Sequence, residues 1–114
     1  MPIGYDAASK KMVFAYTVSS SRGGRIRTLN WDGSSMVMGA EYNLGSGKQR
    51  MYIAGHAASG KVYVQWSNTT AQAAKAPLQI KPFTVNTDAS LSAGSTVTIS
   101  SNNNWYHANF GGDP

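Results

Sequence analysis

The sequence predicts an all-β fold built from antiparallel hairpins. Short segments rich in β-branched and aromatic residues recur about every ten residues, and turn-forming Gly, Ser, Asn and Asp separate them. Charged residues make up only 13% of the chain, whereas surface helices normally carry many Glu and Lys side chains. The chain of 114 residues is long enough for one domain with a buried core.

Six segments have the strand signature. In chain order they are KMVFAYTV (11–18), RIRTLNW (25–31), SMVMGAEYN (35–43), RMYIAG (50–55), KVYVQW (61–66) and STVTIS (95–100). The connections between them contain the residues that hairpin turns need, and Asp32-Gly33 predicts a type I′ turn. The segment 69–76 has no hydrophobic stripe and stops before Pro77, so we expect a loop or a single turn there.

The segment 25–31 has no purely apolar face. Alternation places Arg25, Arg27, Leu29 and Trp31 on one side, and Ile26, Thr28 and Asn30 on the other. We therefore expect this strand to lie near a sheet edge or an interface.

The chain contains an internal echo. IGYDAASKKMVFAY, from Ile3, aligns without a gap with IAGHAASGKVYVQW, from Ile53, and Tyr16 falls opposite Trp66. A period of roughly 40–50 residues is typical of propeller blades. The alternative is two unrelated hairpins with similar turns. We expect a single all-β domain over residues 1–114, with blade-like units of about 1–50 and 51–114 if the repeat is real.

The stretch VFAYTVSSSRGGRIRTLNWDGSSMVMGAEYN (13–43) resembles the repeat of small bacterial and fungal fucose-binding β-propeller lectins. Each repeat of that family has a strand ending in an aromatic residue, a polar turn, a basic strand, Trp-Asp-Gly and then Gly-Ala-aromatic. RMYIAGHAASGKVYVQW (50–66) resembles the opening of a second repeat. The resemblance covers somewhat more than half of the chain and implies a propeller-like lectin architecture. A β-sandwich or barrel is the alternative.

The residues that hold the sugar in that family are not matched in this chain. The family holds fucose with an Arg and a Glu, and the matching positions here are Phe14 and Thr28, which cannot make those charged hydrogen bonds. The fucose chemistry is therefore not transferred.

Two blades cannot close a ring and would expose unpaired strand edges. The resemblance thus implies a homo-oligomer, most simply a trimer.

The sequence contains no motif of a catalytic, metal or nucleotide site. Glu41, Arg50, His56 and His107 could in principle form an acid–base set, but nothing in their spacing brings them together. Two His residues without Cys do not form a zinc pattern, and no glycine-rich phosphate loop precedes a helix. We therefore expect a protein that is not an enzyme and needs no cofactor or metal.

Aromatic residues beside amides suggest a sugar site. The face of an indole packs against sugar C–H groups, while neighbouring amide or imidazole groups bond the hydroxyls. We predict carbohydrate binding, with weak sites strengthened by multivalent display on an oligomer. The candidate ligand-binding residues are Trp66, Trp105, Trp31, Arg27, Gln65, Asn68, Asn104 and His107. Burial in the core is the alternative for each Trp.

The charge balance leaves other partners open. The net charge is +5, and two Arg side chains beside Trp31 would suit single-stranded nucleic acid or an acidic sugar. A basic nucleic-acid-binding module and a structural coat or fibre subunit are therefore the alternatives to a glycan-binding protein. No segment is apolar enough for a membrane span. The chain has no Cys and no visible signal peptide, which favours a cytoplasmic protein or non-classical export.

Overall fold

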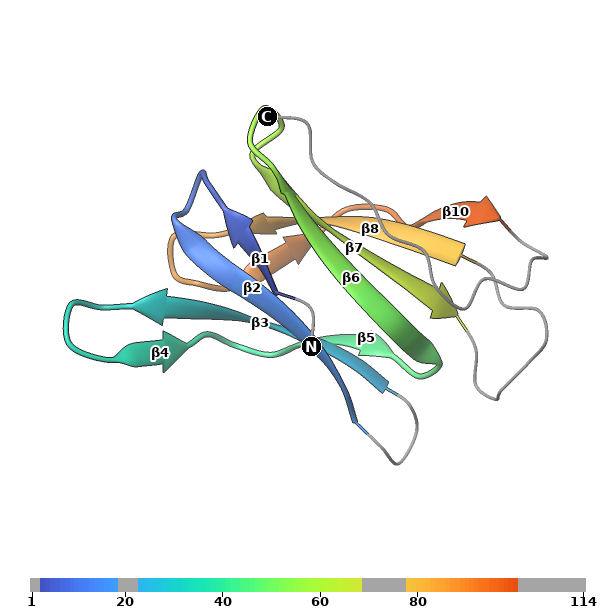
Figure 1. Cartoon of the computed structure of the whole chain (residues 1–114), viewed down its shortest axis with the longest axis horizontal. Coiled ribbons are helices and arrows are strands. Elements are labelled where there is room, and N and C mark those ends of the chain that lie inside the picture. The colour runs from blue at the N-terminus through green and yellow to red at the C-terminus, as the bar shows by residue number, and fades with distance from the viewer. Residues whose placement is uncertain (1–2, 19–22, 69–77, 101–114) are drawn as a thin grey trace.

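The computed structural model describes residues 3–18, 23–68 and 78–100, apart from the side chains of residues 49, 50, 68 and 100 (Figure 1). The described residues form two antiparallel β-sheets and no helix, so the all-β prediction is confirmed. The two sheets do not close into a barrel, which fits the β-sandwich alternative. The segment 69–76, expected to be a loop, lies outside the described residues.

The first sheet is a meander whose outermost strand is divided in two. Its strands are β1 (Ile3–Asp6), β2 (Lys11–Val18), β3 (Gly23–Trp31), β4 (Met36–Met38) and β5 (Tyr42–Gly45). β1, β2 and β3 lie side by side. β5 pairs with the first half of β3 and β4 with its second half, so both short strands occupy the same edge.

The second sheet repeats this arrangement. Its strands are β6 (Lys48–His56), β7 (Lys61–Asn68), β8 (Leu78–Val85), β9 (Leu91–Ala93) and β10 (Val97–Ser100). β6, β7 and β8 lie side by side, β10 pairs with the first half of β8, and β9 pairs with its second half. The two sheets therefore have the same topology.

The sequence echo corresponds to two hairpins with the same turn. In the β1–β2 turn, Lys10 has a φ of 59° and its N–H donates to the carbonyl of Asp6 at 2.8 Å. In the β6–β7 turn, Gly60 has a φ of 67° and its N–H donates to the carbonyl of His56 at 3.1 Å. The shared Ala-Ala-Ser of the two turns thus occupies equivalent positions in equivalent hairpins.

A glycine follows the first part of each divided outer strand. The N–H of Gly39 donates to the carbonyl of Thr28 at 3.0 Å, and the N–H of Gly94 donates to the carbonyl of Pro82 at 2.8 Å. A Cβ on Gly39 would lie 2.0 Å from Thr28 Oγ1, and one on Gly94 would lie 2.6 Å from Pro82 Cγ. These contacts correct the prediction of one strand over 35–43, because the chain bends inward at Gly39 between β4 and β5.

β8 was not among the predicted strands because Lys81 and Pro82 interrupt its apolar pattern. Proline cannot donate to a ladder and is normally excluded from central strands. In an antiparallel strand, the N–H and C=O of one residue point to the same neighbour. The carbonyl of Pro82 accepts the N–H of Gly94, between β9 and β10, so Pro82 faces the outer strand and not β7. The N–H that proline lacks would therefore point to the place where the outer strand is divided. The hydrogen bonds between β8 and β7 are not affected.

A shared core joins the two sheets. Its buried side chains are Val13, Ala15 and Ile26 from the first sheet, and Met51, Val62, Val64, Trp66, Phe83 and Val85 from the second. The rings of Tyr42 and Phe83 meet edge to face across the seam, with centroids 5.0 Å apart. Burial of these apolar side chains is the main term that stabilises the pair of sheets.

Of the two expected positions for β3, near a sheet edge or at an interface, the structure shows the second: β3 is an inner strand whose Ile26 and Thr28 face the other sheet. It pairs with β2 on one side and with β4 and β5 on the other. Ile26 and Thr28 are completely buried, and the Thr28 hydroxyl donates to the carbonyl of Ala89 in the second sheet at 2.8 Å. This long-range partner lets a polar residue occupy the core face of β3.

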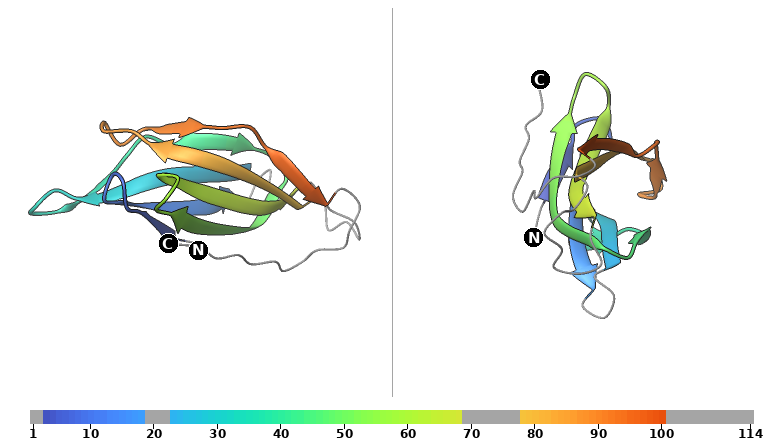
Figure 2. Two further views of the ribbon diagram at one scale, coloured as in Figure 1. Left: turned by 90° about the horizontal axis from the view of Figure 1, so that it is seen from above. Right: turned by 90° about the vertical axis from the view of Figure 1, so that its right-hand side faces the viewer.

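The loop of the β3–β4 hairpin also differs from the prediction. It contains four residues, 32–35, and only Gly33 of the Asp-Gly pair has a positive φ (104°), whereas a type I′ turn requires two. The carboxylate of Asp32 accepts the N–H groups of Ser34 and Ser35, each at 2.9 Å. These hydrogen bonds lower the pKa of Asp32. The hairpin protrudes from the rest of the molecule (Figures 1 and 2).

The two sheets pack head to tail. In the gap-free alignment, Met12, Phe14 and Tyr16 of β2 correspond to Val62, Val64 and Trp66 of β7. The β7 side chains face the seam, whereas the β2 side chains alternate with buried Val13 and Ala15 and so lie on the outer face. The outer face of the first sheet is therefore the counterpart of the face that the second sheet buries.

The equivalent glycines should be equally intolerant of a side chain. We predict that Gly39→Ala and Gly94→Ala each lower the free energy of unfolding by about 1–3 kcal/mol, because the added methyl group overlaps Thr28 or Pro82. Urea denaturation measures the change. Ser95→Ala, at an exposed neighbouring position, should stay within about 0.5 kcal/mol of wild type. Unchanged stability in both glycine variants would contradict the described bend.

Candidate functional site

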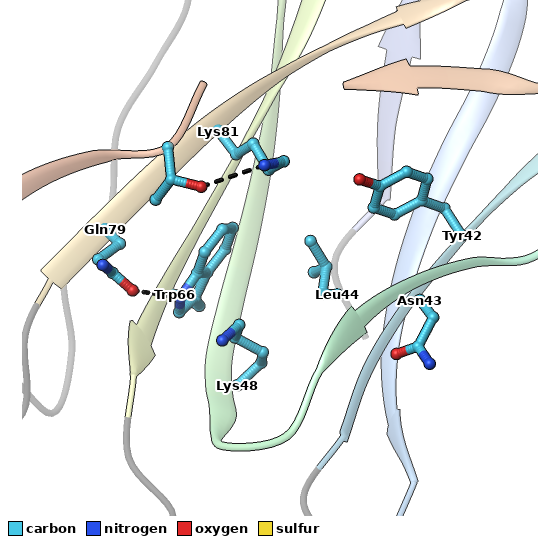
Figure 3. Close-up of a pocket in the computed structure, with 8 residues that line it drawn as sticks. Tyr42, Asn43, Leu44, Lys48, Trp66, Gln79 and Lys81 are labelled. Carbon is cyan, nitrogen blue, oxygen red and sulfur yellow. Dashed lines mark hydrogen bonds between the residues drawn. The ribbon is translucent and has the colours of Figure 1, made fainter. Parts of the chain in front are cut away.

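A pocket of about 280 Å³ opens at the seam between the two sheets (Figure 3). Its lining comes from β5, β6, β7 and β8 and from the residue before β10. The lining residues are Tyr42, Asn43, Leu44, Lys48, Trp66, Gln79, Lys81 and Thr96. The pocket exists because the first sheet contributes β5 at the point where the chain crosses into the second sheet.

Trp66 and Gln79 form the fixed inner wall. They are direct cross-strand partners in β7 and β8, and Trp66 Nε1–H donates to Gln79 Oε1 at 3.1 Å. The amide nitrogen of Gln79 donates in turn to Thr98 Oγ1 at 3.1 Å. Trp66 is only 2% exposed, so the indole presents little surface to the pocket.

Two lysines flank Trp66 (Figure 3). Lys48 Nζ lies 5.4 Å from the centroid of the indole ring, within range of a cation–π interaction, and donates to the carbonyl of Ser46 at 3.2 Å. Lys81 Nζ donates to Thr96 Oγ1 at 3.2 Å. Burial, and then the nearby charge of Lys81, lower the pKa of Lys48. The pocket therefore concentrates positive charge in a partly desolvated place.

β5 forms the opposite wall. Tyr42 directs its hydroxyl toward the pocket (Figure 3). Asn43 Oδ1 accepts hydrogen bonds from Arg25 Nη1 and from the N–H of Gly45, both at 2.8 Å. Asn43 is the cross-strand partner of Arg25, so its side chain lies on the outer face of the first sheet and points away from Trp66 and the two lysines (Figure 3). This arrangement can bind a small polar molecule by hydrogen bonds and charge.

The predicted ligand-binding residues do not converge on this pocket. Trp66 lines it, with Lys48 Nζ over its ring, and the stacking of a sugar on Trp66 stays a prediction. Trp31 ends β3 and is 60% exposed on the outer face of the first sheet. Arg27 lies on that same face, where its Nε donates to the carbonyl of Gly39 at 2.9 Å. Gln65 is buried and alternates with Val64 and Trp66, so it lies on the other face of β7.

The remaining predicted residues cannot be placed. The backbone of Asn68 ends β7, but its side chain lies outside the described residues. Asn104, Trp105 and His107 also lie outside them. The predictions for these four residues stay predictions.

The acid–base set considered from the sequence has separate local partners in the described part of the chain. Glu41 forms an ion pair with Arg25 (Nε–Oε1 3.2 Å) and accepts a hydrogen bond from the hydroxyl of Tyr16. His56 lies at the β6–β7 turn, where its Nδ1 is 2.9 Å from Ser59 Oγ. Within residues 3–18, 23–68 and 78–100, no three His, Asp or Glu side chains group as metal ligands. Nor does any helix there have the length and apolar character of a membrane span.

Most residues of the pocket were not predicted from the sequence. Gln79 and Lys81 share a strand face with Trp66 through the β7–β8 register, which becomes visible only once β8 is recognised as a strand. Lys48 stands in the polar connection GSGK and resembles an ordinary solvated loop residue. The alternation Gln79, Lys81, Phe83 in LQIKPFTV was the one available signal.

Comparison with known proteins adds no relative: no family model, curated protein or solved structure matches the chain. The resemblance of residues 13–43 to the fucose-binding lectins therefore stays a prediction.

The two lysines should be electrostatically coupled. We predict that Lys48 titrates below the ordinary lysine pKa, and that Lys81→Gln raises the pKa of Lys48 without restoring its ordinary value, because burial is the larger cause. NMR titration of the lysine Nζ–Cε signals measures both values. Lys10→Gln is the matched control and should leave Lys48 unchanged. A pKa of Lys48 insensitive to Lys81→Gln would contradict the close approach of the two charges.

Proposed function

We propose that the chain is a non-catalytic carbohydrate-binding protein whose site is the seam pocket. The observation that carries the proposal is the composition of the lining, which combines two aromatic residues with amide, hydroxyl and ammonium groups. A sugar has apolar C–H faces and many hydroxyls and needs such a mixture. The volume of about 280 Å³ lies near the lower end of the roughly 300–1,000 Å³ typical of small-molecule sites.

The roles of the side chains follow from their positions in the pocket. Tyr42 supplies the aromatic contact, since Lys48 lies over the ring of Trp66. Trp66 instead orients Gln79, which joins Thr96 as the hydrogen-bonding groups for sugar hydroxyls. Such a site binds without changing its ligand, and binding by a single pocket of this size is weak.

The fold supports a propeller-like architecture with association between chains. A propeller blade is a four-stranded antiparallel meander, and each sheet here is such a meander with a divided outer strand. Head-to-tail packing is heterologous and continues until a ring closes. The outer face of the first sheet carries exposed apolar side chains, namely Ile3, Tyr5, Trp31, Met36 and Met38. We infer a homo-oligomer that covers this face, a trimer if six blades close the ring.

Sugar binding should depend on the pocket and resist salt. We expect a glycan array to give binding that persists at high salt, and Gln79→Ala to weaken it by several-fold to about tenfold, the value of one hydrogen bond. Thr87→Ala, in the exposed β8–β9 turn, is the control. Thermal unfolding shows whether each variant is folded.

Three other outcomes have distinct meanings. No glycan signal would refute the proposal. Unchanged binding by Gln79→Ala would place the sugar site elsewhere in the chain. Binding that favours single-stranded oligonucleotides and falls steeply with salt would identify a nucleic-acid-binding module instead.

Association should depend on one face of β4. Met38 pairs with Leu29 on the outer face, whereas the adjacent Val37 points the opposite way, and both are exposed. We predict that Met38→Lys raises the dissociation constant of the oligomer at least about tenfold, because it buries an unpaired charge, while Val37→Lys does not. Sedimentation equilibrium measures both. A monomeric wild type, or equal effects of the two variants, would contradict association through this face. Self-association without glycan binding would favour a structural subunit.

A further inference from the structure

The described lining of the seam pocket carries positive charge. Its lining includes two lysines and no carboxylate among the described residues. The lysines come from different strands, Lys48 from the start of β6 and Lys81 from the middle of β8. They lie on either side of the Trp66 ring and extend into the same space (Figure 3).

Burial and the proximity of the two positive charges are electrostatically unfavourable for Lys48. Lys48 is partly desolvated and repelled by Lys81, as the lowered pKa of Lys48 reflects. The indole of Trp66 and the carbonyl of Ser46 contact the ammonium group of Lys48, and the hydroxyl of Thr96 accepts a hydrogen bond from Lys81.

The described carboxylates are engaged in other places. Asp6, Asp32 and Asp88 accept hydrogen bonds from Ser residues within their own turns. Glu41 pairs with Arg25 on the outer face of the first sheet. None of these four side chains lines the pocket.

We propose that the pocket selects sugars bearing a negative group, a carboxylate or a sulfate, which the pocket lysines Lys48 and Lys81 attract. This inference rests on the proposed carbohydrate-binding function and specifies its ligand class. An anion in the pocket offsets the repulsion between the two ammonium groups and accepts a charge-assisted hydrogen bond, which is about twice as strong as a neutral one. The sugar ring then lies toward Tyr42, with Gln79 and Thr96 within reach of its hydroxyls.

The pocket geometry distinguishes this site from a general basic surface. A nucleic-acid-binding surface needs a groove that follows several phosphates, whereas here two lysines converge on one cavity of about 280 Å³. One anionic group on a compact ligand is the match in size and charge. Two basic residues of the first sheet, Arg25 and Arg27, already bond Glu41 and the carbonyl of Gly39.

The test compares ligands of matched size by isothermal titration calorimetry on the full chain. The probes are glucuronic acid, glucose 6-sulfate, glucose, inorganic sulfate and a short single-stranded oligonucleotide. We expect the two charged sugars to bind at least about tenfold more tightly than glucose. Lys81→Gln and Lys48→Gln should each remove most of that preference, whereas Lys10→Gln, with the same change of charge at an exposed turn, should not.

The outcomes separate this inference from the function on which it rests. Equal binding of glucose and the charged sugars, unaffected by the lysine variants, would overturn the inference and leave carbohydrate binding intact. Absence of binding by every sugar would overturn both. Inorganic sulfate or the oligonucleotide binding as tightly as the charged sugars would overturn the selection of a sugar. Preference for glucuronic acid over the sulfate, or the reverse, would identify the negative group. Lys81→Arg, which keeps the charge, should retain the preference if Lys81→Gln acts through charge.

Discussion

The close contact between β1 and β6 is the constraint on which the rest of the structure depends. A Cβ on Gly4 would lie 2.4 Å from Ile53 Cγ2, and a Cβ on Gly55 would lie 2.1 Å from the carbonyl oxygen of Tyr5. The two hairpins can cross only because both positions lack a side chain. This crossing sets the distance at which Val13 and Ala15 reach the core of the second sheet, and it fixes where the seam opens into a pocket.

Head-to-tail packing of two similar sheets has two consequences that a symmetric sandwich would not have. It leaves the outer face of the first sheet, including Trp31 and Met38, without the cover that the equivalent face of the second sheet receives. It also makes the seam asymmetric, since β5 meets β7 and β8 there. Lys48 and Lys81 are brought together by this meeting of strands, so the proposed chemistry follows from the packing.

Local pattern predicted much of the fold and little of the pocket. The limits of β2 match the predicted strand 11–18, because its alternation and its flanking turns are both local signals. β8 was missed because the division of the outer strand that accommodates Pro82 is a tertiary feature. The polar Thr28 left open whether β3 lies near an edge or at an interface, because its partner, the carbonyl of Ala89, is 61 residues away. The pocket depends on the β7–β8 register and on the seam, which no short segment encodes.

The central claim is that the ligand binds at the seam. The most direct test is an NMR titration of the indole N–H signals with the best-binding sugar. Trp66 Nε1–H bonds Gln79 inside the pocket, whereas Trp31 lies on the outer face. The account predicts that the Trp66 signal moves saturably with ligand and that the Trp31 signal does not. Movement of Trp31 with an unchanged Trp66 signal would place binding on the outer face and contradict a seam site.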